Sequence, residues 1–362
     1  MPGFSPELIA DIANTTLDTY LNRGEVFKNN IQNKPMLKAF DEAAGKFAGG
    51  KANVSIAVSA GQGGGALQGF TGDDQVSYYN PVGTKRFTSA WKEHHIGTVV
   101  TMSELKVDGI DVDESDGGQS TSEMAGRDFQ ALADRMDEKN EMLGEDFSKS
   151  LDLLIHQDGS SDTKALAGLQ SLILAVPNTG TTGSINRVAN PWWRNRAATA
   201  AFAAAGGQNA ITVSATNGGA LVAFLQKEVR QLKRFSSGSS KWKWFAGSDW
   251  LDGYLLEIRA NGQYSQKGWR GEGSVNAAMD DPAFGDTKIE YDPTLDDMGL
   301  AKRCYVIDIS KRGIRLEYMD GQKMKKHKPS RPYDRYVIYN GITMTGLMVA
   351  RQLNTSAVYD IA

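Results

Sequence analysis

The sequence predicts an α+β fold, in which a two-stranded hairpin precedes one very long helix and a strand-rich part follows residue 288. Three observations predict it. Apolar and polar residues alternate at 54–58, a helical apolar stripe runs through about 120–157, and short β-type runs recur toward the C-terminus. With 40% hydrophobic and 23% charged residues among 362, the composition is that of a globular protein with a sizeable core.

The N-terminal residues indicate a helical arm. Ser5 and Pro6 suit the N-cap and first positions of a helix at 5–23, whose apolar residues fall roughly on one face. A second short helix is predicted at 36–47. Two roles for the arm remain open: packing on its own domain, or reaching onto a neighbouring subunit. The N-terminus has no secretory pattern and no run suits a membrane helix, so we expect a protein made and used in a cytoplasm.

The segment 51–107 predicts a protruding β-hairpin. Val54, Ile56 and Val58 alternate with small polar residues, and a long second strand is expected at about 86–102. Glycines and polar residues fill 61–80 between the strands, which is typical of a flexible tip. Such an arm exposes backbone edges and apolar groups that a neighbouring subunit could cover.

The clearest local signal is the long helix. Ser120 and Glu123 fit a capping box, apolar residues then recur at helical spacing, and Gly159 marks the end. At 1.5 Å per residue, a helix of about 35 residues spans roughly 50 Å. Since only one stripe is apolar, we expect this helix to lie on the surface of a sheet.

The C-terminal half mixes helix and strand. A helix is predicted at 217–235 with Asn217 as its cap, and 243–259 combines turn and strand signals. Strands are predicted at 288–291, 303–309, 314–318, 336–342 and 346–350.

The charge balance argues against a dedicated nucleic-acid-binding domain, because 40 basic residues nearly balance 43 acidic ones. The acidic group Asp280, Asp281, Asp292, Asp296 and Asp297 lacks the spacing of a calcium loop, so a solvated surface is favoured. A basic group is formed by Lys323, Lys325, Lys326, Lys328 and Arg331. Three roles for it stay open: contact with DNA phosphates, contact with an acidic patch of another subunit, and a solvated loop.

No catalytic, cofactor-binding or metal-binding residue is predicted. The glycine run 61–66 formally resembles a dinucleotide fingerprint, but the glycines after it would not open the helix that a phosphate site needs. His94 and His95 are adjacent on a predicted strand and point to opposite faces. His156 lacks partners at a recognisable spacing, and Cys304 sits in an apolar run typical of a buried thiol.

Several segments carry a resemblance to a known family. Residues 151–159 followed by 167–169 are similar to the exit of the spine helix in tailed-bacteriophage major capsid proteins. Residues 190–194, followed by the helix at 217–235, resemble the entry into the axial domain of that family, and 91–104 resembles the returning strand of its hairpin. The order of arm, hairpin, long helix and mixed α/β half extends the resemblance over essentially the whole chain.

The resemblance implies a domain layout and a function. It implies an N-terminal arm at 1–50, an E-loop hairpin at 51–107, a P-domain at 108–208, an A-domain at 209–287 and a strand-rich return at 288–362. The implied function is a structural, non-enzymatic subunit of an icosahedral shell, built of homo-hexamers and pentamers around double-stranded DNA. The implied location is the virion capsid, assembled in the bacterial host cytoplasm without a membrane.

Further partners follow from the same resemblance. A portal protein is implied, and scaffolding or decoration proteins are possible partners. Some family members begin with a long built-in scaffold, for which the early hairpin leaves no room here. A phage tail or baseplate protein and a cytoplasmic α/β enzyme remain alternatives.

Assembly contacts are expected along the hairpin. The candidate residues are Phe70, Tyr78, Tyr79, Lys85, Trp91 and Lys92. In some members of the family a hairpin lysine forms an isopeptide bond with a neighbour's asparagine, and Lys85 and Lys92 lie in the corresponding region.

Overall fold

The computed structural model describes residues 32–47, 52–60, 67–80, 83–107, 126–201, 203–204, 209–216, 219–236, 238, 240–260, 282–285, 287–327 and 337–362. The chain divides into two units. The described part of unit 1 is mainly Glu93–Leu151 and Tyr318–Thr345. Unit 2 comprises Asn33–Lys92, Asp152–Glu317 and Gly346–Ala362. The predicted helix at 5–23 and the capping box at Ser120 lie outside the described residues.

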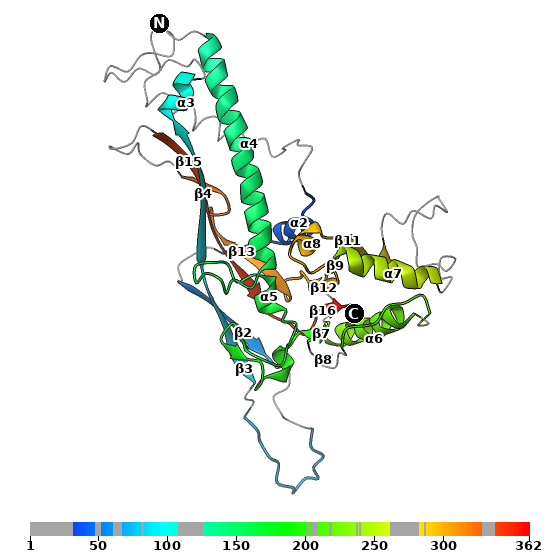
Figure 1. Ribbon diagram of the computed structural model, residues 1–362. Coiled ribbons are helices and arrows are strands. Elements are labelled where there is room, and N and C mark those ends of the chain that lie inside the picture. Colours follow the sequence, from blue (N-terminus) through cyan, green and yellow to red (C-terminus); the bar gives the residue numbers. More distant parts are fainter. Residues whose placement is uncertain are drawn as a thin grey trace. The chain divides into compact units, whose positions relative to one another are not determined.

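Unit 1 is a helix packed on a small sheet (Figure 1). Its elements are β4 (Lys92–Thr101), α3 (Met102–Val107), most of α4 (Gly126–His156), β14 (Lys325–His327) and the first part of β15 (Val337–Ala350). Strand β15 pairs with both β4 and β14. Ile96 and Ile342 of the sheet pack against Leu143 and Phe147 of α4. The predicted spine helix is therefore confirmed where it is described, and its apolar stripe lies on a sheet.

Unit 2 is built on a seven-stranded sheet, in the order β10-β11-β9-β12-β16-β7-β8. Its strands are β10 (Ala283–Phe284), β11 (Thr287–Tyr291), β9 (Trp242–Ala246), β12 (Arg303–Asp308), β16 (Ala357–Asp360), β7 (Arg196–Ala198) and β8 (Ala203–Ala204). The pairs β11/β9 and β16/β7 are parallel. Helices α6 (Ala220–Phe235) and α7 (Ser248–Ala260) share one apolar core with these strands (Figure 1).

Smaller elements complete unit 2. Two hairpins are β2 (Asn53–Ser59) with β3 (Thr84–Ala90), and β5 (Thr181–Thr182) with β6 (Ile185–Asn186). The remaining elements are α2 (Pro35–Glu42), β1 (Gly45–Phe47), α5 (Leu169–Leu172), the 3-10 helix η2 (Pro191–Trp193), α8 (Pro293–Asp297) and most of β13 (Ile314–Met319). Strand β1 pairs with β13, and β13 with β15.

The α+β prediction is confirmed, but several element boundaries were wrong. The helix predicted at 36–47 ends at Glu42, and Gly45 starts β1. The cap of α6 is Gly219, at φ 81°, rather than Asn217. The strands predicted at 336–342 and 346–350 are one strand of 14 residues, β15.

The long second strand predicted at 86–102 is two strands with different partners. β3 pairs with β2, whereas β4 pairs with β15 of unit 1. The interruption falls at Trp91, whose ring packs on Phe47 with 5.6 Å between centroids. The division into arm, E-loop, P-domain and A-domain at the expected residue numbers stays a prediction.

Residues 243–259, where turn and strand signals mix, contain strand β9 and helix α7. Gly247 lies between β9 and α7. The chain passes so close to Ala301 at this point that a Cβ on residue 247 would lie 2.4 Å from the Ala301 carbonyl oxygen. Trp250, Tyr254 and Glu257 then point inward at helical spacing. The aromatic residues of this segment are more typical of strands, so the sequence did not predict the helix.

Candidate assembly surfaces

The base of the β2–β3 hairpin is anchored inside unit 2. Val54, Val58 and Phe87 are each at most 5% exposed. The Phe87 ring packs on Trp193 of η2, with 6.0 Å between ring centroids. The neighbouring Thr88 amide donates to the Gly183 carbonyl oxygen at 2.9 Å. These contacts fix the root of the hairpin to the β5–β6 turn.

Gly183 makes this packing possible. Its φ of 57° lies in the left-handed region, and a Cβ there would lie 2.0 Å from Cδ2 of Phe87. We expect Gly183→Ala to lower the free energy of unfolding by about 2–4 kcal/mol, from backbone strain plus overpacking. Chemical denaturation with hydrogen exchange in β2 and β3 measures the effect.

Gly180→Ala is the matched control. Gly180 also has a positive φ, 75°, but a Cβ there meets nothing within 4 Å. This variant should therefore show only the backbone strain, about 1–2 kcal/mol. Equal losses in the two variants would contradict the proposed role of the Phe87 contact.

The hairpin tip, residues 67–80, is held by its own polar contacts. Gln68 Nε2 donates to Ser77 Oγ at 2.7 Å, and the Ser77 amide donates back to Gln68 Oε1 at 3.4 Å. The Thr71 amide donates to Asp74 Oδ2 at 2.9 Å, which closes a turn. No helix or strand is assigned within 67–80. The tip is thus a loop closed by its own polar contacts rather than a continuation of the strands.

Apolar side chains of the tip are exposed to solvent. Tyr78 is 92% exposed, and Leu67 is fully exposed. The other exposed apolar residues of the tip are Phe70, Val76 and Tyr79. The candidates Phe70, Tyr78 and Tyr79 therefore lie on one loop, where nothing in the described chain covers them. A loop that exposes several large apolar side chains is typical of an interaction site.

The other hairpin candidates lie apart from the tip. Lys85 is exposed on β3, opposite Val58. Trp91 is half-buried against Phe47. Lys92 Nζ donates to the carbonyl oxygen of Thr163. Their role in assembly stays a prediction, and Trp91 and Lys92 also stabilise their own unit.

The basic group lies at and before β14 in unit 1. Lys325 is exposed, Lys326 is half-buried, and both pair with β15. Lys323 Nζ lies 5.7 Å from the centroid of the Tyr318 ring, a cation–π distance. Lys328 and Arg331 lie outside the described residues.

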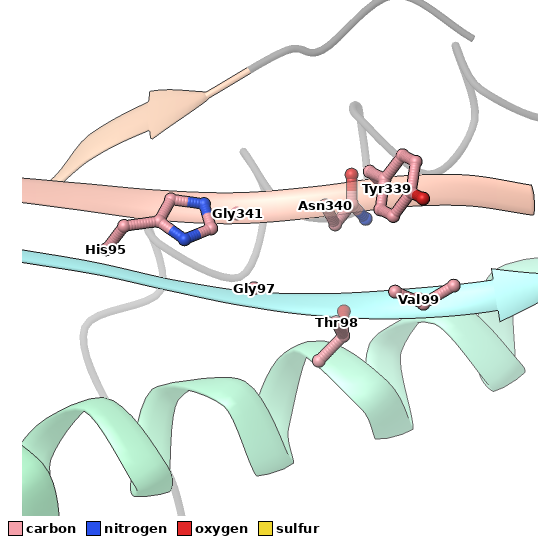
Figure 2. A pocket seen from close by; sticks show the side chains of 7 residues that line it. All are labelled: His95, Gly97, Thr98, Val99, Tyr339, Asn340 and Gly341. Carbon is pink, nitrogen blue, oxygen red and sulfur yellow. The ribbon is translucent and has the colours of Figure 1, made fainter. Parts of the chain in front are cut away.

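A groove that the sequence did not indicate lies on the sheet of unit 1 (Figure 2). It is a cavity of about 330 Å³ over β4 and β15. Its lining residues are His95, Gly97, Thr98, Val99, Tyr339, Asn340 and Gly341. A Cβ at Gly341 would lie 2.6 Å from His95 Nε2, and one at Gly97 would lie 2.9 Å from the Asn340 carbonyl oxygen. The two glycines therefore form the floor of the groove, where a side chain would collide with these neighbouring atoms.

The end of α4 carries a buried polar cluster. His156 Nε2 lies 2.9 Å from Asp292 Oδ2, and His156 Nδ1 lies 2.8 Å from the carbonyl oxygen of Asp152. Thr294 Oγ1 donates to Asp152 Oδ2 at 2.6 Å. All four residues are at most 4% exposed. The prediction that Asp292 belongs to a solvated acidic surface was wrong, because it caps α8 and pairs with His156.

Both ring nitrogens of His156 face oxygen acceptors, so the arrangement fits a doubly protonated imidazolium. Burial lowers the pKa of His156, but the hydrogen bond and charge of Asp292, with the charge of Asp152, raise it above its usual value overall. Burial also raises the pKa of the Asp152 carboxyl. The cluster joins the end of α4 to α8, which lies 136 residues away in sequence.

A second buried charge pair lies under α6. Arg196 of β7 donates two hydrogen bonds to the Glu228 carboxylate of α6, and Tyr359 of β16 donates a third at 3.2 Å. Glu257 of α7 accepts the first amides of α6, from Leu221 and Val222, at 2.9–3.2 Å. These carboxylates fix α6 to the sheet and to α7.

No group of three or more His, Cys, Asp and Glu that could hold a metal ion is present among the described residues. Cys304 is fully buried, and burial raises its pKa well above the usual value, which disfavours the thiolate. No helix in the described part of the chain is long and apolar enough to cross a membrane.

Comparisons with solved structures identify the fold. No protein-family model matches the chain, and no curated protein matches it. Among solved structures, the cyanophage A-1(L) capsid matches with a TM-score of 0.62 at 14% identity, over 92% of this chain and 95% of that chain. The chain has the tailed-phage capsid fold.

Two further capsids agree. The capsid of cyanophage P-SCSP1u has a TM-score of 0.54 at 9% identity, over 94% of this chain and 91% of that chain. The capsid of Myoviridae phage XM1 has a TM-score of 0.52 at 12% identity, over 94% of this chain and 95% of that chain. The assignment of α4 to a spine helix, of the β2–β3 hairpin to an E-loop and of the seven-stranded sheet with α6 and α7 to an axial domain stays a prediction.

Proposed function

We propose that this protein is the major structural subunit of an icosahedral viral capsid. It self-assembles into hexamers and pentamers that enclose double-stranded DNA. One observation supports the proposal above the others: a chain with the capsid fold presents a loop of exposed apolar side chains on a rigidly anchored hairpin. A monomer gains nothing by exposing such a loop, whereas a shell subunit can bury it against the next copy.

The shell is stabilised by many weak contacts. Each closed, symmetric contact can be small, yet simultaneous engagement of many makes the assembly persistent. We propose a virion location after assembly in a bacterial cytoplasm, with a portal and, where needed, scaffolding or decoration proteins as partners. The chain acts by association rather than by catalysis. Lys323, Lys325 and Lys326 contribute either a DNA-facing or an intersubunit surface.

Electron microscopy of the purified protein tests the proposal directly. Closed polyhedral shells are the expected result. Tubes or rings would instead indicate a tail or baseplate component, and a small oligomer that binds a ligand saturably would indicate an enzyme. Either result would overturn the capsid proposal.

Replacing Phe70, Tyr78 and Tyr79 with serine should abolish shell formation while the subunit stays folded. These side chains are exposed, so their loss leaves the core of unit 2 unchanged. Assembly should fall more than about 100-fold, since every copy in the shell loses the same contact, measured by sedimentation, with circular dichroism to verify folding. A matched control replaces Val188, Phe235 and Leu256, which are exposed elsewhere, with serine. Assembly that responds equally to both triple variants would contradict a specific role for the tip.

A further inference from the structure

The outward face of helix α6 is basic. Leu221, Leu225 and Leu232 point into the core of unit 2, and the side chains on the opposite side of the helix are exposed. The only acidic residue of α6, Glu228, is buried and bound to Arg196. The exposed charged residues of α6 are Lys227, Arg230, Lys233 and Arg234. Residues 227, 230 and 234 are spaced by three and four, so they form one stripe along the helix.

These four cations have no acidic partner in the described part of the chain. The guanidinium of Arg234 instead lies 5.6 Å from the centroid of the Phe235 ring. Lys233 and Arg234 occupy the last turn of α6, where positive charge complements the helix dipole. Lys227 and Arg230 lie before that turn, so stabilisation of the helix does not account for the whole stripe.

The charge excess remains when the neighbouring helix is included. Helix α7 shares an apolar core with α6 and exposes Asp249, Asp252 and Arg259 (Figure 1). The two helices together therefore expose five cations and two carboxylates. Because the whole chain has a formal net charge of -3, this positive excess is a local feature of unit 2.

Two further cations lie near the C-terminal end of α6. Gln352 Nε2 donates to the carbonyl oxygen of Phe235 at 2.9 Å. The preceding residue, Arg351, donates from Nη1 to the carbonyl oxygen of Lys311 at 2.8 Å. These two hydrogen bonds from adjacent residues bring the turn at 311–312 close to the end of the helix. Both Lys311 and Arg312 are exposed.

The composition of the α6 face suits phosphates better than a protein partner. Protein interfaces have a largely apolar centre in which lysine is depleted. The α6 face exposes Ala223 and Gln226 besides its cations, and its one large exposed apolar side chain, Phe235, lies at the end of the helix. Lys227 and Arg234 are seven residues apart, about 10 Å along the axis. A DNA duplex carries one charge per about 1.7 Å of its axis, so several phosphates lie within reach of such a stripe.

We propose that the outward face of α6 binds the phosphates of the enclosed double-stranded DNA, and that this face points to the interior of the shell. Lys227, Arg230, Lys233 and Arg234 provide the contacts. Binding is independent of base sequence, because these side chains meet the phosphate backbone rather than base edges. The inference rests on the proposed shell function and names the surface of the subunit that meets the DNA.

The salt dependence of DNA binding tests the proposal. Unassembled subunits at low concentration are titrated with a fluorescent 30-base-pair duplex at several NaCl concentrations, and binding is followed by anisotropy. One variant replaces the four α6 cations with glutamine, which keeps the helix propensity. The matched control removes the same charge at four exposed lysines outside α6 and α7. These are Lys38, Lys46, Lys164 and Lys302.

The α6 variant should bind the duplex at least about 100-fold more weakly than wild type at 50 mM salt. Its plot of log affinity against log salt should have a slope smaller in magnitude by about 3–4, since each lost phosphate contact removes about 0.9. The control should keep most of the wild-type slope. Equal slopes in both variants, or a wild-type protein that does not bind the duplex, would overturn the α6 proposal.

Electron microscopy of the same proteins separates the two proposals. Closed shells with an unchanged slope would overturn the α6 surface and leave the shell function standing. A reduced slope in a protein that never forms shells would support the DNA-binding surface and overturn the shell function. An α6 variant that binds DNA like wild type but fails to assemble would show that the stripe contacts an acidic surface of another copy instead.

Chemical labelling tests the interior position independently. Gln226→Cys places a thiol among the cations, and the only native cysteine, Cys304, is buried. In assembled shells, a small maleimide should label residue 226, whereas a maleimide on a polymer too large to enter the shell should label it at least about ten-fold less than in free subunits. Equal labelling of shells and subunits by the large reagent would place the stripe outside and overturn the proposal. Protection from both reagents would indicate a subunit contact and overturn it too.

Discussion

Replacing Glu228 with glutamine is expected to lower the free energy of unfolding by about 3–5 kcal/mol, the cost of breaking a buried ion pair at one partner. Glu228 is 1% exposed, and its carboxylate accepts two hydrogen bonds from Arg196 and one from Tyr359. Glutamine has one oxygen in place of two, and no charge. The Arg196 guanidinium would then stay buried without a counter-charge on Glu228.

The electrostatics of Arg196 agree with this expectation. Burial lowers the pKa of Arg196, but the hydrogen bonds and charge of Glu228 raise it above the usual value overall. Removal of the carboxylate takes away the largest opposing contribution and leaves the burial penalty opposed mainly by Tyr359. In thermal unfolding, each kcal/mol corresponds to about 2–4 °C for a domain of 150–250 residues, so a fall on the order of 10 °C is expected.

Two variants separate the ion pair from general damage. Glu290→Gln breaks an exposed pair, in which Lys243 Nζ lies 3.7 Å from Glu290 Oε1, and should cost less than about 1 kcal/mol. Replacing both Arg196 and Glu228 with apolar residues of similar volume should recover part of the loss, since no buried charge remains. A double replacement as unstable as Glu228→Gln would show that the loss comes from packing rather than from charge.

His156→Gln should remove a pH dependence of stability as well as stability itself. The folded-state pKa of His156 is raised above its usual value, so the folded protein binds this proton more tightly than the unfolded chain does. The stabilisation is therefore complete below about pH 6.5, the unfolded value, and is lost as pH rises through the folded pKa. The pKa of Asp152 is raised too, so its contribution also declines with rising pH, in the acidic range.

Denaturant unfolding between about pH 6 and pH 9 measures the effect. Wild-type stability should fall with rising pH, with a slope of at most about 1.4 kcal/mol per pH unit from this one proton. His156→Gln should be less stable by about 3–5 kcal/mol at the lower pH, because Asp292 stays buried without its cation, and its slope should be flatter.

His95→Gln is the matched control, because His95 is exposed in the groove. Comparison of the two variants separates loss of the buried cation from replacement of a histidine in general. The groups that face His156 are Asp152 of its own helix and Asp292 at the start of α8, and Lys34 acts on Asp152. A His156→Gln protein with an unchanged slope would exclude this residue as the source of the pH dependence.

Periodic features of the chain could be predicted from the sequence. The apolar stripe of α4 was visible because Leu143 and Phe147 repeat at helical spacing, and α4 ends at His156, three residues before Gly159, whose φ is 73°. The β2 strand was visible because Val54 and Val58 alternate with polar neighbours. Each of these signals lies within a few residues, where periodicity is informative.

The polar sites could not be predicted in the same way, because their partners are far apart in sequence. His156 and Asp292 are 136 residues apart, and Arg196 and Glu228 are 32 apart. No local spacing links such pairs, so a buried aspartate looks the same in sequence as a solvated one. The groove was missed because Gly97 and Gly341 lie on strands that meet only in the fold.

The chain order of the sheets has a consequence for synthesis. Strand β15 pairs with β4, which precedes it by more than 230 residues, and β16 lies between β12 and β7 inside the seven-stranded sheet. Both strands come after every other strand in chain order. Neither unit can therefore complete its sheet until the ribosome has released these late residues. A nascent chain can therefore carry its hairpin while both of its sheets are still incomplete.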